Sequence, residues 1–166
     1  MAVLHEHIMA GRLGEGGFYL PPDDTIYLSE SAARNMIGTG AESRSMAATA
    51  GHEMVHMLGG REQTRQAFVR YFRGERWICY WSAFEEGMAE LTTRDAFGDD
   101  AGASRIYGAN VDLMRGIMRT LGEDRVRRAY FTGTPDSAIF EALRAALPNH
   151  LDPGLPPICH TPETTP

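Results

Sequence analysis

Apolar residues recur three or four positions apart over most of the chain from residue 42 onward. This spacing predicts a helix over 42–58, which two glycines then end. The same spacing predicts helices at 61–72, 81–97, 104–121 and 123–130. A last helix is predicted from Thr134 to about residue 147, because Thr is a good N-cap and Pro135 fits the first helical position.

The chain before residue 41 has a different pattern. Residues 25–29 alternate between apolar and polar side chains and are β-prone, which predicts a short strand. Two prolines and two aspartates at 21–24 indicate a turn before this strand. We therefore expect an α+β fold, in which a small antiparallel sheet with an edge strand precedes a mostly helical core.

The length and the proline distribution predict the domain organisation. A chain of 166 residues fits one compact domain, which we place at 1–147. Six of the nine prolines lie at 148–166, so this segment is expected to be an extended or loosely packed tail.

The charge and the hydropathy of the chain argue against several classes of partner. The net charge is -6 without a basic block, which argues against nucleic-acid binding. No apolar run reaches the roughly 20 residues that a membrane span needs, and the first ten residues do not resemble a signal peptide. A cytoplasmic protein, or one exported by a signal-independent route, is expected. All 16 basic residues are Arg, which codon bias explains most simply and work inside a foreign cytosol explains less simply.

The motif that carries chemistry is His52-Glu53-Met54-Val55-His56, in the predicted 42–58 helix. Residues four apart share a helix face, so both imidazoles can reach one zinc ion. Glu53 then lies beside the metal, where it can take a proton from a bound water as general base. Chance gives about 0.02 such motifs in a chain of this composition, so the motif predicts a metal site.

The third ligand is expected in the predicted 81–97 helix, which carries Glu85, Glu86 and Glu90. A metal-bound His usually donates its second ring N–H to a carboxylate. Glu86 and Glu90 share a face, so we assign Glu86 as the ligand and Glu90 as the partner of His52. Gly87 would let the two metal helices pack closely.

Glu62 is a rival third ligand. It stands six residues after His56, where the metzincin signature has its third ligand, although that class usually has His or Asp there. The other interpretation of Glu62 is a first-turn residue of the next helix, favourable with the helix dipole.

The two motifs together resemble the gluzincin class of zinc metallopeptidases, whose third ligand is a Glu on a second helix. The resemblance covers 52–56 and 85–90 and implies a minimal, zincin-like, thermolysin-like catalytic core. It also implies that Ile26, Tyr27 and Leu28 form an edge strand that pairs with substrate main chain. The 29 residues between His56 and Glu86 depart from the commonest family spacing, and the helix at 61–72 would fill this insertion.

The related enzymes use a downstream Tyr or His to stabilise the oxyanion. Here Tyr107, Tyr130, His150 and His160 are available, and we favour Tyr107 slightly, with Tyr130 as the alternative.

These residues predict a metallopeptidase that uses one catalytic zinc ion on protein or peptide substrates. A toxin- or effector-type endopeptidase and a housekeeping peptidase both fit them. The alternatives are a non-catalytic peptide-binding pseudo-peptidase, against which intact Glu53 argues, and a zinc hydrolase of a non-protein amide such as a cell-wall peptide.

Overall fold

A computed structural model describes residues 17–20, 25–28, 41–73, 77–98 and 107–147. The two strands and six helices of these residues are β1 (Gly17–Leu20), β2 (Thr25–Leu28), α3 (Ala41–Leu58), α4 (Arg61–Phe72), α5 (Trp77–Phe97), α6 (Gly108–Leu121), α7 (Glu123–Thr132) and α8 (Ser137–Ala146). The predicted tail at 148–166, with His150 and His160, lies outside the described residues.

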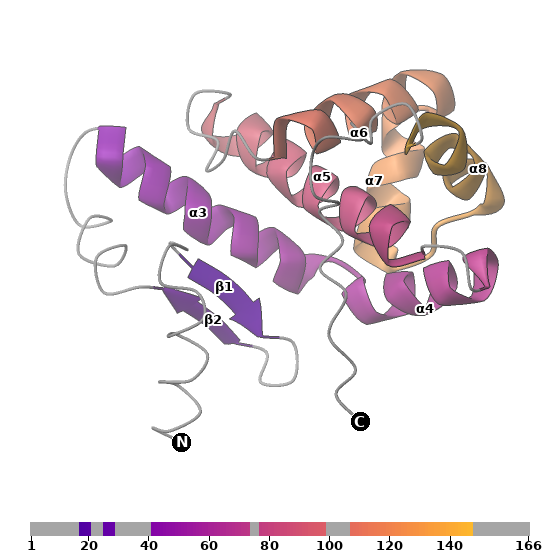
Figure 1. Cartoon of the computed structure of the whole chain (residues 1–166). Helices are drawn as coiled ribbons and strands as arrows, with labels where there is room; N and C mark the ends of the chain where they lie inside the picture. Colours follow the sequence, from indigo (N-terminus) through magenta and orange to yellow (C-terminus); the bar gives the residue numbers. More distant parts are fainter. Residues whose placement is uncertain (1–16, 21–24, 29–40, 74–76, 99–106, 148–166) are drawn as a thin grey trace, which may run out of the picture.

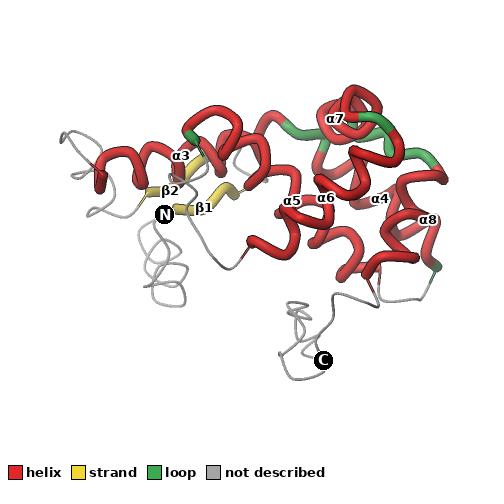
Figure 2. Tube along the Cα trace, turned by 90° about the horizontal axis from the view of Figure 1, so that it is seen from above, coloured by secondary structure: helices red, strands yellow, loops and turns green. Residues whose placement is uncertain are grey.

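The long helix α5 is the centre of the arrangement. It contacts each of the other described helices, and α6 runs along it. Seen from above, α3 and the two strands lie on one side of α5 and α6, whereas α4, α7 and α8 lie on the other (Figure 2). Residues of α3 and α5 therefore face each other across one interface.

The expected α+β class is wrong, because the described part of the chain is predominantly helical. A short strand does occupy the predicted place, as β2. It pairs antiparallel with β1 from Gly17↔Leu28 to Leu20↔Thr25, and these four-residue strands form one two-stranded ribbon. A ribbon of this length cannot cover a hydrophobic core, so helix-on-helix packing builds the molecule.

Helix ends follow the sequence closely, with three departures at helix starts. α4 has the predicted bounds, but α5 begins four residues early, at Trp77. α6 begins four residues late, at Gly108, with Tyr107 as its N-cap. The N-cap of α8 is Asp136 rather than Thr134, since Asp136 Oδ1 accepts the backbone N–H groups of Ala138 at 3.0 Å and Ile139 at 3.2 Å. In the described part of the chain, no helix is both long and apolar enough to cross a membrane.

Four phenylalanines from three helices form what we call the aromatic core. The ring of Phe68 lies 5.8 Å from Phe72, 5.7 Å from Phe84 and 5.0 Å from Phe140 between centroids. All four side chains are buried. They join α4, α5 and α8 on the side of α5 away from α3.

Glycines allow two close contacts. A Cβ on Gly60 would lie 2.2 Å from the backbone nitrogen of Gly133, so the turn between α3 and α4 fits only without a side chain there. A Cβ on Gly87 would meet Met114 at 2.7 Å and the carbonyl of Asn110 at 2.8 Å. Gly87 thus admits α6, and the expectation that it faces the other metal helix is wrong.

Candidate metal centre

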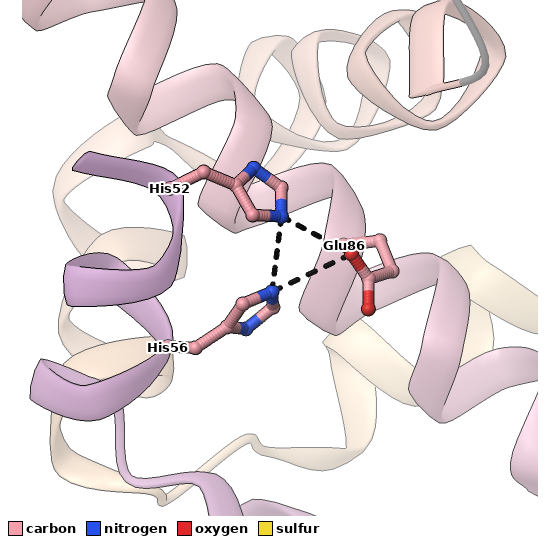
Figure 3. A group of neighbouring side chains, drawn as sticks. All are labelled: His52, His56 and Glu86. Carbon is pink, nitrogen blue, oxygen red and sulfur yellow. Dashed lines mark hydrogen bonds and ion pairs between the residues drawn. The ribbon is translucent and has the colours of Figure 1, made fainter. Parts of the chain in front are cut away.

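Three side chains from two helices converge at the interface of α3 and α5. His52 and His56 project from successive turns of α3, and Glu86 reaches them from α5 (Figure 3). Glu86 Oε2 lies 3.3 Å from His52 Nε2 and 3.4 Å from His56 Nε2, and the two Nε2 atoms lie 3.1 Å apart. The sequence prediction named these three residues as the ligands.

The size of this triangle fits a zinc ion. Bonds of about 2.0–2.1 Å in a tetrahedral site place neighbouring ligand atoms about 3.3–3.4 Å apart. The three observed separations, 3.1, 3.3 and 3.4 Å, are close to that edge. Two imidazole nitrogens and one carboxylate oxygen are also a ligand set typical of catalytic zinc.

The charge around the triangle also fits a divalent cation. Four carboxylates act on the two histidines, those of Glu53, Glu85, Glu86 and Glu90. Two guanidinium groups lie against them, with Arg94 at Glu90 and Arg61 at Glu85. With neutral histidines, the four carboxylates exceed the two guanidinium groups by two negative charges, which the two positive charges of one zinc ion would balance.

Glu90 lies beside His52, for which the sequence predicts it as a partner. Its Oε2 lies 3.3 Å from His52 Nδ1, the ring nitrogen turned away from the triangle. Its Oε1 accepts a hydrogen bond from Arg94 Nε at 2.8 Å. A carboxylate at Nδ1 favours the tautomer in which Nε2 presents its lone pair to a metal.

Glu85 and Arg61 are the residues that sequence reasoning missed. Glu85 Oε1 lies 3.8 Å from His56 Nδ1 and 3.9 Å from Arg61 Nε. The sequence prediction favours Glu86 over Glu85 because Glu86 shares a helix face with Glu90. The signal that could have found Glu85 is its place directly before the predicted ligand Glu86, on a helix that faces both histidines.

The electrostatics favour charged groups in the triangle when no metal is bound. Burial acts to lower the pKa of His52, but Glu86 and Glu90 outweigh it and raise this pKa to about 9. Burial has the same effect on His56, where Glu85 and Glu86 outweigh it and raise the pKa. Burial acts to raise the pKa of Glu86, and the two histidines lower it well below its usual range. A metal ion must therefore displace protons from the histidines.

The two candidate tyrosines differ in their surroundings. The ring of Tyr107 stacks on His52, with centroids 5.4 Å apart and planes 15° from parallel. Tyr130 is fully buried, and its hydroxyl donates to the carbonyl of Val55 at 3.4 Å. Burial, reinforced by the charge of Glu85, raises the Tyr130 pKa well above its usual value. Tyr107 thus lies beside a predicted ligand, whereas Tyr130 braces the α3 backbone.

The rival ligand Glu62 lies elsewhere. Its carboxylate is exposed on the first turn of α4, where it accepts hydrogen bonds from Arg65 at 2.8 Å and Gln66 at 2.9 Å. These hydrogen bonds, of which the one from Arg65 has the larger effect, lower the pKa of Glu62 to about 2. The metal-ligand group found among the described residues is His52, His56 and Glu86, so the structure favours the Glu86 assignment.

The predicted substrate strand is near α3 but not part of the triangle. β1 and β2 both contact α3, and β1 does so more extensively (Figure 1). Substrate pairing at Ile26, Tyr27 and Leu28 of β2 remains a prediction.

Comparison with known proteins adds no relative: no family model matches the chain, and no curated protein or solved structure does so either.

Proposed function

We propose that this chain is a zinc-dependent metallopeptidase that hydrolyses peptide bonds in protein or peptide substrates. The observation that carries the proposal is the triangle of His52, His56 and Glu86, whose edges fit a tetrahedral zinc site. The gluzincin resemblance of the same residues supports it.

The triangle favours a catalytic site over a structural one. Structural zinc sites use four protein ligands, whereas catalytic sites use three and leave one position open. His52 and His56 are 5% and 4% exposed, while the Glu86 side chain is 21% exposed. A substrate would therefore approach from the side of Glu86.

Each neighbouring residue has a role in the proposed reaction. A zinc ion, when bound, supplies a Lewis acid that acidifies water and polarises a carbonyl. Glu53 accepts the proton from the attacking water and delivers it to the leaving amine. The Tyr107 hydroxyl donates a hydrogen bond to the developing oxyanion.

The test combines metal content with cleavage. We expect about one zinc per chain in the wild type, retained in Glu53→Gln and lost in Glu86→Ala. Cleavage of casein and of a peptide library should fall at least about a hundredfold in Glu53→Gln. Glu62→Gln is the matched control, because it neutralises an exposed carboxylate and should change neither result.

Two outcomes would contradict the proposal. A wild-type protein without zinc would remove the metal centre. A zinc-loaded protein that cleaves cell-wall fragments but no protein or peptide would move the activity to a non-protein amide.

A further inference from the structure

The helix that separates His56 from Glu86 along the chain returns to the metal centre through its first residue. Arg61 begins α4, and its Nε lies 3.9 Å from Glu85 Oε1. The guanidinium also lies over the ring of Trp81, 5.4 Å from its centre, at cation–π distance. Trp81 and Glu85 are four residues apart on α5, so they present one face to Arg61.

Glu85 is buried without the hydrogen bonds that a carboxylate normally needs. Its side chain is 1% exposed, and neither oxygen has a hydrogen-bond partner among the described residues. Its separations of 3.8 Å from His56 Nδ1 and 3.9 Å from Arg61 Nε exceed hydrogen-bond length. Burying an unpaired carboxylate is costly, so the ion pairs with His56 and Arg61 are what compensates for the burial of Glu85.

The two histidines are supported in different ways. At His52, both the carboxylate and the arginine come from α5, with Arg94 bonded to Glu90 at 2.8 Å. At His56, the carboxylate comes from α5 but the arginine comes from α4. The support of His56 therefore depends on how α4 packs.

We propose that Glu85 and Arg61 are a positioning pair for His56, in which Glu85 orients the ring through Nδ1 and Arg61 holds the Glu85 carboxylate in place. The inference rests on the proposed zinc site and extends it, because it gives α4 a part in metal affinity. The guanidinium also lies over the Trp81 ring, and this cation–π contact restrains it further.

The test is zinc affinity, measured by competition with a chromophoric chelator on the full chain. Glu85→Gln should weaken zinc binding about tenfold or more, as loss of a partner behind a metal ligand typically does. Arg61→Gln should weaken it by about threefold to tenfold, because Arg61 acts through Glu85. Arg61→Lys should recover most of the loss. Arg65→Gln is the matched control, since Arg65 is on the same helix and pairs with the surface residue Glu62.

The double variant Glu85→Gln/Arg61→Gln distinguishes positioning from general loosening. If Arg61 acts through Glu85, the double variant should bind zinc no more weakly than Glu85→Gln alone. Far-UV circular dichroism and metal-free melting of each variant show whether the helices are intact. Should Glu85→Gln fail to fold, the variants Arg61→Gln and Arg61→Lys, which change a more exposed side chain, still show whether the pair affects zinc affinity.

Independent losses that multiply in the double variant would overturn the inference, as would zinc affinities within twofold of the wild type. If the wild type takes up zinc and the variants bind it with the same affinity, only this inference is removed. A wild type that takes up no zinc removes the proposed function as well.

Discussion

The aromatic core and the candidate metal centre meet on α5, only two residues apart at Phe84 and Glu86. The core consists of apolar rings, whereas the candidate metal centre consists of ionisable side chains. The core packs four buried phenylalanine rings. The candidate metal centre buries two histidines and two carboxylates, those of Glu85 and Glu90, which are 1% and 0% exposed. Buried apolar area stabilises a fold, whereas buried charge costs free energy unless it is paired. The comparison teaches that the core stabilises the helices that hold a costly site together.

The largest expected effect is on the core. Phe68→Ala should lower the free energy of unfolding by about 3–5 kcal/mol, because it opens a cavity among three other rings. Urea unfolding followed by circular dichroism measures this. Val69→Ala is the neighbouring control, since Val69 is 39% exposed, and it should change stability by less than about 0.5 kcal/mol. Equal losses in the two variants would contradict the assignment of the core.

Metal removal should change the stability that the candidate metal centre contributes, without altering the aromatic core. At zinc a hundredfold above its dissociation constant, binding should add about 2.7 kcal/mol to the stability of the wild type. Chelation should therefore lower its melting temperature. Glu86→Ala should melt at the same temperature with and without zinc, because it lacks one of the three ligands. A wild-type melting temperature that is the same with and without zinc would show that the triangle holds no metal.

Removing the support of His52 should have a smaller effect. Glu90→Gln should weaken zinc binding about 10–100-fold, or about 1.4–2.7 kcal/mol, because the carboxylate no longer orients the ring through Nδ1. Glu123→Gln is the matched control: it breaks another pair four residues apart, with Arg127 at 2.7 Å, on the exposed surface of α7. Zinc affinity that falls equally in both variants would mean that Glu90 acts only through the net charge.

The same comparison explains what the sequence could predict. His52, His56, Glu86 and Glu90 were predictable because each pair lies four residues apart on one helix, so local geometry fixes the shared face. Arg61 was not, since its contact with Glu85 depends on how α4 turns back after Gly60. Local rules do not encode such a return.

The prediction of the fold class was wrong for a related reason. Alternation at 25–29 correctly indicated a strand, but alternation in one segment does not reveal how many strands join it. The N-cap of α8 was misplaced because Thr134 and Asp136 both suit that position, and only the backbone path decides which one the helix uses.

The smallest expected effect lies outside both regions, at the start of α8. Asp136→Ala should cost about 1 kcal/mol, because two backbone N–H groups lose their acceptor. Burial acts to raise the pKa of Asp136, but the hydrogen bond from Arg125 and those from the backbone lower it overall. Its contribution is therefore complete above the pKa of an unfolded Asp and is lost as pH falls through the lower folded value. Urea unfolding between pH 7 and pH 3 should show the variant and the wild type converging at the acid end. The cost should also be equal with and without zinc if α8 is independent of the metal centre, and a zinc-dependent cost would show that the two regions are coupled through α5.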